Sequence, residues 1–195
     1  MICSDADILK YQNEFQIIDP FEEKQLGPAS YDLSICGPYL QYRATMFFPG
    51  SGTFMRGGMR SLKSMTDDDL IEKHSRIALE PGQFALATTT ATLHIPNFLA
   101  ARIEGRSSIA RIGLLVHCAG GFIDPGFVGQ VTMELANVGE QIIVIEDGDI
   151  ISQVAFFCMT SPAIHPYRGK YQGQRGTTPS RGVSDMVADF SQNAP

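Results

Sequence analysis

Glycine and proline recur at short intervals along this chain, and they restrict it to short regular elements. The 195 residues include 19 glycines and 11 prolines, with brief apolar runs between them. These runs predict strands at Gln83–Thr88, Gln130–Ala136, Ile142–Ile145 and Ile150–Phe157. Short strands separated by turn residues, without long alternating helices, are typical of an all-β barrel or sandwich.

Helical patterns are few. They cover Asp5–Gln12, Asp67–Lys73 and Ser107–Ile112. The segment Ala44–Ser64 is rich in glycine and methionine, and we predict a long irregular excursion that could equally cap a site. With 44% hydrophobic and 18% charged residues, a chain of this length is predicted to form one domain over residues 1–195.

Charge and composition argue against several classes of protein. A net charge of −6 disfavours an extended surface for nucleic-acid backbones, which needs many Lys and Arg side chains. The chain has neither a basic start followed by an apolar run nor eighteen uninterrupted apolar residues, so we expect no membrane span and a cytoplasmic location. The cysteines form no CxxC pair and the histidines no HxE or HExxH spacing, so no zinc site is predicted.

The C-terminal tail, from about residue 165, is locally basic. No acidic residue occurs between Asp149 and Asp185, and this window holds Arg168, Lys170, Arg175 and Arg181, interleaved with glycines. Such a segment buries little by itself, so we predict a flexible tail that becomes ordered when an anion binds. A solvated tail without a function is the alternative.

The segment Gly105–Gly113, GRSSIARIG, begins with a glycine and two serines before a short helical pattern. Free N–H groups at a helix start, the hydroxyl groups of Ser107 and Ser108 and the guanidinium groups of Arg106 and Arg111 could form a phosphate cradle. Two serines that cap the helix, with arginines on the surface, are the ordinary alternative.

The segment Gly120–Phe127, GGFIDPGF, places one carboxylate between glycines in a stretch that must turn sharply. Asp124 before Pro-Gly is ordinary turn chemistry. In a functional interpretation the glycines allow the backbone to approach a ring or sugar, and Asp124 accepts a hydrogen bond or orients a water.

The predicted strand Gln130–Ala136 has two faces, because successive side chains of a strand point in opposite directions. One face carries Val131, Met133 and Leu135, and the other carries Thr132, Glu134 and Ala136. Glu134 therefore points away from the main apolar face. It faces solvent, or, if a neighbouring subunit covers this face, it is a partly desolvated carboxylate suited to general-base catalysis.

Taken together, these segments resemble the dCTP deaminase family of the dCTP deaminase and dUTPase superfamily. The resemblance rests on the order of GRSSIARIG, FIDPGF, TMEL and KYQGQRG, with PASYDL at Pro28–Leu33, and it runs from Ser4 to Arg181. It implies a mainly β fold, a distorted antiparallel β-barrel of the dUTPase-like, β-clip type with a few short helices. It also implies a homotrimer whose sites are built from neighbouring subunits.

The resemblance also implies roles for individual residues. Glu134 would take a proton from a water that attacks C4 of cytosine, while Ser107 and Arg111 hold the water and the ring. Asp124 would contact the deoxyribose and serve a second hydrolysis. The implied nucleotide-binding residues are Arg106, Ser107, Ser108, Arg111, Asp124, Thr132, Met133, Glu134, Gln153, Tyr167, Lys170 and Gln174. Mg²⁺ would arrive with the triphosphate, and no zinc is implied.

Two reactions are found among enzymes of this family. Some only deaminate dCTP to dUTP, and others also release diphosphate and give dUMP for thymidylate synthesis. Gly121-Phe122 stands where deaminase-only members tend to carry a His-Arg pair, so the sequence favours the dUMP-forming reaction. A deaminase-only enzyme, a dUTPase inactive on cytosine and a non-catalytic deoxynucleotide sensor are the alternatives.

One departure from the family pattern lies in the loop before Asp124. Many relatives read Thr-Ala where this chain has Ala119-Gly120, so a hydroxyl group is lost and a glycine is gained. Because the glycine loosens the loop, inhibition by dTTP and the base preference of the family are not carried over to this chain.

Overall fold

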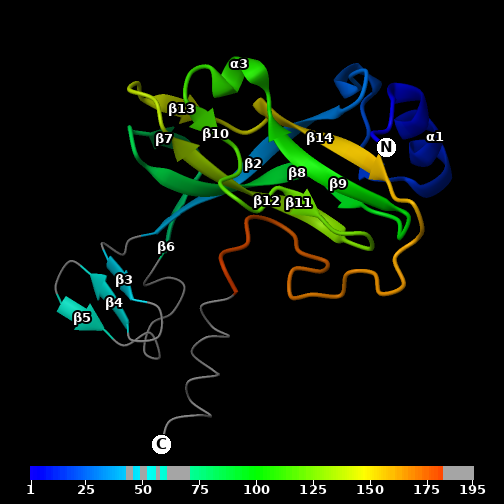
Figure 1. Ribbon diagram of the computed structural model, residues 1–195. Coiled ribbons are helices and arrows are strands. Elements are labelled where there is room, and N and C mark those ends of the chain that lie inside the picture. Colours follow the sequence, from blue (N-terminus) through cyan, green and yellow to red (C-terminus); the bar gives the residue numbers. More distant parts are fainter. Residues whose placement is uncertain (43–45, 49–51, 56–57, 61–70, 182–195) are drawn as a thin grey trace, which may run out of the picture.

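The computed structural model describes residues 1–42, 46–48, 52–55, 58–60 and 71–181 (Figure 1). Most of the described chain forms one nine-stranded antiparallel sheet, in the order β10-β12-β8-β2-β14-β9-β11, with β1 on β8 and β6 on β2. Its strands are β1 (Ile18–Asp19), β2 (Tyr31–Tyr42), β6 (Ile71–His74), β8 (Phe84–His94), β9 (Leu99–Gly105), β10 (Leu114–Leu115), β11 (Phe122–Ile123), β12 (Val128–Asn137) and β14 (Ile150–Cys158). The sheet curls into a half-barrel, which confirms the mainly β, barrel-like prediction.

The four predicted strands all exist, and most are longer than the apolar runs that indicated them. They correspond to β8, β12, β13 (Ile143–Ile145) and β14, and β13 pairs with β7 (Ile77–Leu79) in a separate two-stranded sheet. Every second residue of β12 is buried, as the alternating pattern predicts. The buried side chains form one main core within the curl of the sheet, which includes Tyr31, Leu135 and Phe156.

Helices are short. In α1 (Asp5–Phe15) the hydroxyl of Ser4 accepts a hydrogen bond from the N–H of Asp7, whose side chain accepts one from the N–H of Ser4. This reciprocal capping box explains why the predicted helix begins at Asp5. The other described helices are η1 (Glu23–Gln25) and α3 (Ser107–Ala110).

Two predictions fail between residues 44 and 73. Ile71, Glu72 and Lys73 belong to β6 rather than to a helix, because pairing with β2 gives their backbone partners that an isolated helical turn lacks; residues 67–70 lie outside the described residues. The predicted irregular excursion contains β3 (Met46–Phe48), β4 (Gly52–Met55) and β5 (Gly58–Arg60), which pair as an antiparallel sheet. The rest of Ala44–Ser64 is not described.

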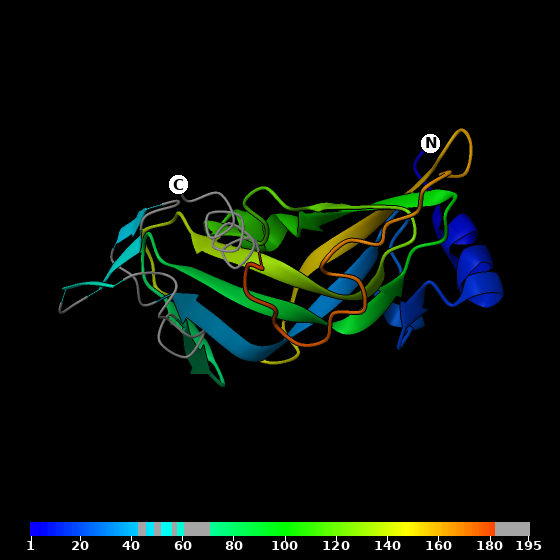
Figure 2. The ribbon, with the colours of Figure 1, turned by 90° about the horizontal axis from the view of Figure 1, so that it is seen from below.

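The last described segment, residues 165–181, lies along β12. Figure 2 shows it, orange to red, crossing the sheet over β12 and β8. The N–H of Gly173 donates to the carbonyl of Val128 (2.8 Å), and the N–H of Gln130 donates to the carbonyl of Gln174 (3.0 Å). The flexibility predicted for the tail stays a prediction. Among the described residues, no helix is long and apolar enough to span a membrane.

Candidate functional site

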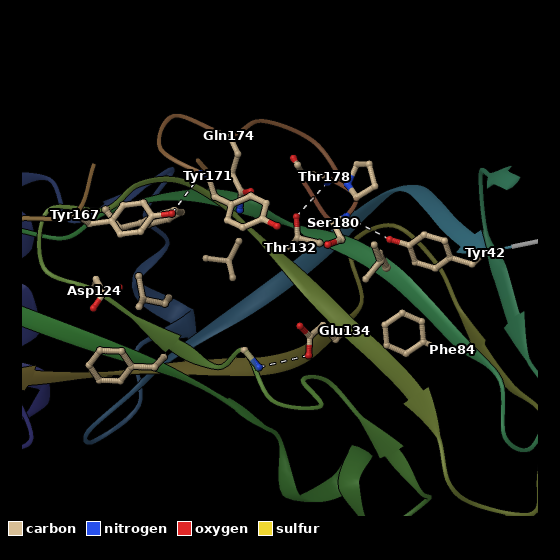
Figure 3. Close-up of a pocket in the computed structure, with 17 residues that line it drawn as sticks. Tyr42, Phe84, Asp124, Thr132, Glu134, Tyr167, Tyr171, Gln174, Thr178 and Ser180 are labelled. Atoms are coloured by element: carbon tan, nitrogen blue, oxygen red, sulfur yellow. Dashed lines mark hydrogen bonds between the residues drawn. The ribbon is translucent and has the colours of Figure 1, made fainter. Parts of the chain in front are cut away.

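A cavity of about 560 Å³ lies between β12 and the tail (Figure 3). Its walls come from β12, the 120–127 loop, the start of β8, the end of β2 and the tail. Of the residues predicted from the sequence, the cavity is lined by Asp124, Thr132, Glu134, Tyr167 and Gln174, which we call the pocket group. These side chains come from three separate segments of the chain, so the fold brings together residues that the sequence places up to 50 positions apart.

β12 presents Thr132 and Glu134 to the cavity because the strand alternates. Val131, Met133 and Leu135 face the core, and the two polar side chains between them face outward and are half-buried. Glu134 pairs with Leu86 across the sheet. The side chain of Met133 is therefore buried away from the cavity, and only its main chain can contribute to a site on the outward face.

The carboxylate of Glu134 is held by the backbone of the loop that precedes Asp124. Its Oε2 accepts hydrogen bonds from the N–H groups of Cys118 (3.0 Å), Ala119 (3.1 Å) and Gly120 (3.4 Å). Successive N–H groups that converge on one oxygen form a small anion-binding nest. The base predicted from the sequence is thus a carboxylate fixed in the wall of a pocket.

Cys118 shares this loop, and its Sγ points at the backbone carbonyl of Glu134 (3.6 Å). Desolvation of the thiol, together with the nearby Glu134 carboxylate, raises the pKa of Cys118 above its ordinary value. The thiol therefore stays protonated at neutral pH, which makes it a hydrogen-bond donor rather than a nucleophile.

Asp124 begins a tight turn whose backbone is closed by a hydrogen bond from the N–H of Phe127 to the carbonyl of Asp124 (3.2 Å). The side chain of Asp124 is exposed and lines the cavity. Gly126 has a φ of 90°, and a side chain there would collide with Pro166 of the tail. Glycine at this position therefore lets the tail pack against the turn.

The tail closes the opposite wall of the cavity. The N–H of Tyr167 donates to the carbonyl of Pro125 (2.7 Å), and the Gln174 amide donates to the carbonyl of Gln130 (2.6 Å). Further along, the N–H of Thr178 donates to the hydroxyl of Thr132 (3.1 Å). Gln174 is 8% exposed and Tyr167 is half-buried. Lys170 is exposed, with its ammonium 5.8 Å from the ring centre of Tyr171.

The other predicted residues lie elsewhere, at the end of β9 and on β14. We call Arg106, Ser107, Ser108, Arg111 and Gln153 the α3 group, and none of them lines the cavity. Figure 1 shows α3 at the top and the tail along the bottom of the molecule. Within the described residues, no hydrogen bond or ion pair joins Glu134 to Ser107 or Arg111.

The α3 group lies where β9 ends beside β14. Arg106 precedes α3 and lies 3.4 Å from Asp32, and it also donates to the carbonyl of Ile150 (3.3 Å). Gln153, next to Asp32 in the register of β14 and β2, accepts a hydrogen bond from the hydroxyl of Ser30 (2.8 Å). The PASYDL segment thus supplies partners for this group.

The serines of α3 do not cap it. The capping position is occupied by Arg106, which makes no side-chain capping bond, and the helix ends at Ala110. Ser107, Ser108 and Arg111 are exposed. The capping interpretation of the two serines is therefore wrong, because both lie inside the first turn rather than before it.

Sequence reasoning missed the aromatic lining of the cavity. Tyr42, Phe84, Phe122, Phe127 and Tyr171 contribute to its walls. Phe122, which lines the cavity, is 62% exposed. The sequence carried one signal for them: Phe122 and Phe127 flank Asp124, and Tyr171 lies in the tail motif.

The comparisons with known proteins show the family of the chain. Residues 2–159 match the family described as dCTP deaminase-like. Proteins named "dCTP deaminase, dUMP-forming" are similar over nearly the whole chain. The protein from Corynebacterium efficiens is 38% identical over 97% of this chain and 98% of its own, and that from Dictyoglomus thermophilum is 36% identical over 93% and 94%.

Among solved structures, the fold is similar to that of the 2′-deoxycytidine 5′-triphosphate deaminase from Agrobacterium tumefaciens. The TM-score is 0.58 at 21% identity, over 80% of this chain and 46% of that longer chain. This likeness concerns the fold alone. From the sequence match over residues 2–159 and the near full-length relatives, we conclude that the chain belongs to the dCTP deaminase-like family.

Proposed function

We propose that this protein hydrolyses dCTP to dUMP, ammonia and diphosphate, and so supplies dUMP for thymidylate synthesis. The observation that carries the proposal is Glu134, a carboxylate fixed in the wall of a cavity of nucleotide size, in a chain whose near full-length relatives are named dUMP-forming dCTP deaminases. A cavity of about 560 Å³ falls within the range of pockets that enclose small ligands.

In the deamination step, water adds to C4 of the cytosine ring and ammonia leaves, so that C4 becomes a carbonyl. We propose that Glu134 takes the proton from the attacking water and returns protons to the ring nitrogen and the departing amine. Ser107 and Arg111 would hold the water and the base in register with the carboxylate. Glu134 ends the cycle ionised, because every proton that it accepts leaves with a product.

In the second step, water attacks the α-phosphorus and diphosphate leaves. We propose Asp124 as the residue that orients this water, with Arg106, Ser107 and Ser108 holding the phosphates and Tyr167, Lys170 and Gln174 closing over them. The exposed carboxylate of Asp124 lies in the turn that the tail packs against, which supports this pairing of loop and tail. Charge-assisted bonds from Arg106 would stabilise the negative charge that develops on the phosphates.

A magnesium ion would accompany the triphosphate. The α3 group offers Mg²⁺ the oxygen atoms of two serine hydroxyls, whereas the nearby Asp32 carboxylate is already paired with Arg106 at 3.4 Å. When bound, the ion would neutralise phosphate charge. Among the described residues, no three His, Cys, Asp or Glu side chains stand close enough to form a metal cage, so the phosphates would be its main ligands.

We propose that the complete site forms between copies of the chain in a homotrimer. The pocket group and the α3 group would carry complementary parts of one reaction. Within one chain, however, the α3 group lies apart from the cavity that the pocket group lines. A cyclic trimer places one surface of each copy against a different surface of the next, which is how the two groups would meet. The cytoplasmic location expected from the sequence stays a prediction.

The products formed from dCTP test the proposal. Purified protein with dCTP and Mg²⁺ is expected to release ammonia, dUMP and diphosphate in equal amounts, measured by anion-exchange chromatography and a coupled ammonia assay. Ammonia with accumulating dUTP would replace the proposal by a deaminase-only enzyme. Turnover of dUTP alone would indicate a dUTPase, and tight dCTP binding without any product would indicate a deoxynucleotide sensor.

A further inference from the structure

Two of the four cysteines lie against each other at the end of β14. The Sγ atoms of Cys3 and Cys158 are 3.3 Å apart, although 155 positions separate the residues in the sequence. Cys3 precedes Ser4, the capping residue of α1, and Cys158 is the last residue of β14. Figure 1 shows the N-terminus and α1 beside this end of β14. Neither cysteine lines the cavity, and α3 follows the opposite end of β9 from the one that pairs with Cys158.

The backbone holds both cysteines in these positions. The N–H of Cys3 donates to the carbonyl of Phe156 (2.9 Å), and the N–H of Cys158 donates to the carbonyl of Met1 (2.8 Å). These two bonds belong to a short antiparallel bridge, in which Cys3 lies opposite Phe156. Phe156 and Cys158 are two residues apart on one strand, so the two cysteines project to the same face. A disulfide bond needs its sulfur atoms about 2.05 Å apart, so these two would have to approach by only about 1.2 Å.

The two thiols differ in their access to solvent. Cys3 is fully buried, and Cys158 is half-buried. Burial, followed by the hydrogen bond with Cys158, raises the pKa of the Cys3 thiol to about 12. The Tyr11 hydroxyl lies 3.5 Å from the Sγ of Cys158, and this hydrogen bond, together with burial, raises the pKa of Tyr11 to about 12. Cys3 and Tyr11 are therefore protonated at neutral pH, and Cys158 is the sulfur of the pair that a small oxidant reaches first.

We propose that Cys3 and Cys158 form a redox modification site, at which a peroxide converts the two thiols to a disulfide bond. Hydrogen peroxide first oxidises the Cys158 thiol to a sulfenic acid and releases one water. The sulfur of Cys3 then attacks the sulfur of Cys158, the S–O bond breaks, and the departing hydroxide takes the thiol proton of Cys3 and leaves as a second water. The two thiols lose two electrons and two protons, and the peroxide accepts all of them.

Contact between the two sulfur atoms makes the second step possible for a buried thiol. Cys3 has a small thiolate fraction, because its pKa is raised, and a thiol of this kind reacts slowly with a partner that it must meet by diffusion. Here the partner is already 3.3 Å away. Holding two reacting groups together raises their effective concentration, which offsets the small thiolate fraction.

The disulfide would join the start of α1 to the end of β14. It would close a loop that contains most of the chain, and a long closed loop restricts the unfolded chain strongly, so the bond is expected to stabilise the fold. Side-chain packing already holds α1 at this place, with the rings of Tyr11 and Phe98 5.5 Å apart between their centres. The bond would add a covalent link there without touching the cavity, so this proposal does not depend on the proposed function.

Cys118 provides a matched comparison, because it is more exposed than Cys158 but has no cysteine beside it. Its Sγ lies against the carbonyl of Glu134 (3.6 Å), and that of Cys36 lies against the carbonyl of Thr89 (4.0 Å). Exposure alone would direct oxidation to Cys118 and would end at sulfenic or higher acids. Contact between two thiols instead directs it to a disulfide of Cys3 with Cys158.

The test treats the reduced protein, in its native assembly, with hydrogen peroxide. The peroxide is removed with catalase, the remaining thiols are alkylated after unfolding, and mass spectrometry measures the intact chain and its linked peptides. Two of the four thiols are expected to resist alkylation until a reductant is added, and the peptide that contains Cys3 should be linked to the one that contains Cys158. The melting temperature of the oxidised protein should rise by about 5–15 °C and return on reduction.

Variants separate the pair from a general sensitivity to oxidation. In Cys3→Ala, peroxide should leave Cys158 as a sulfenic acid that dimedone traps, with no rise in melting temperature, whereas Cys118→Ser should form the disulfide as the wild type does. A wild-type protein that keeps Cys3 and Cys158 open to alkylation, or that links cysteines of different copies, would overturn the proposal even if Cys3→Ala does not fold. A disulfide without a higher melting temperature would refute the stabilising role. None of these measurements uses dCTP, so this proposal and the proposed function can fail separately.

Discussion

The pocket group and the α3 group differ in how many hydrogen bonds within one copy of the chain fix their side chains. Glu134, Thr132 and Gln174 are held by hydrogen bonds that link β12, a loop and the tail within a single copy. Ser107, Ser108 and Arg111 are exposed at the end of the sheet. The pocket group is thus arranged before any ligand binds, while in the α3 group Arg106 is paired with Asp32 and Arg111 faces solvent.

This difference has a physical basis in the two kinds of element. β12 is a ten-residue strand paired with β8 along most of its length and with β10 at Ala136 and Asn137, so its outward side chains have fixed directions. α3 has four residues and no side-chain cap, so its exposed side chains are fixed by little besides their own rotamers. Binding of phosphates would supply the partners that α3 lacks.

The largest expected effect comes from disabling one half at a time. Glu134→Gln and Arg111→Ala are each expected to lower the rate of ammonia release by about 10²-fold or more, because each removes a group that acts on the water or the ring. When both variants are produced together in equal amounts and assemble as mixed trimers, about one quarter of the sites should combine two intact halves. Activity is therefore expected to reappear, measured as ammonia release.

The control for this experiment is each variant assembled with itself under a second affinity tag, which should remain inactive. Binding of dCTP to Glu134→Gln, measured by calorimetry, is expected to persist because the glutamine keeps the shape of the pocket. A mixture no more active than its separate components would mean that one chain contains the whole site. That outcome would contradict the division of the site between the pocket group of one copy and the α3 group of another.

Local sequence patterns were sufficient where the structure depends on neighbouring residues. The alternation along Gln130–Ala136 predicted which face carries Glu134. The capping box at Ser4 and Asp7 marks the start of α1. The helix predicted at Asp67–Lys73 failed over Ile71–Lys73, because pairing with β2, about 30 residues earlier, decides the conformation of β6 and leaves no local trace.

The surroundings of Glu134 could not be predicted for the same reason. The loop at Cys118–Gly120 reaches the carboxylate across 14 to 16 positions of the chain, and the tail reaches Thr132 across 46. Such contacts depend on how the strands are arranged in the sheet. From the sequence, Gly120 is expected to loosen the loop, which stays a prediction; the structure adds that a Cβ atom at this position would lie 2.9 Å from Oε1 of Glu134.

A smaller effect is expected from the phosphate-binding side of the α3 group. Arg106→Ala is expected to raise KM for dCTP about 10-fold to 100-fold, because it removes a charge-assisted bond to phosphate worth about 1.5–3 kcal/mol. The melting temperature should change little, since the Arg106–Asp32 pair is only half-buried and ion pairs near the surface contribute at most about 1 kcal/mol. Arg102→Ala, which removes an exposed arginine paired with Glu104 on the same strand, is the control. A similar rise in KM for both variants would argue for a general charge effect.

The smallest effect is expected where the tail meets the pocket group. Thr132→Val keeps the shape of the side chain but removes the hydroxyl that accepts the N–H of Thr178. Losing one hydrogen bond costs about 0.5–1.5 kcal/mol, so KM for dCTP should rise a few-fold and proteolysis of the tail should quicken. Thr160→Val, at an exposed position outside the cavity, is the control. If the KM of Thr132→Val for dCTP and the rate of proteolysis of its tail equal those of the wild type, the tail is held without the Thr132 hydroxyl. Gln174 and Tyr167 would then hold it against the cavity instead.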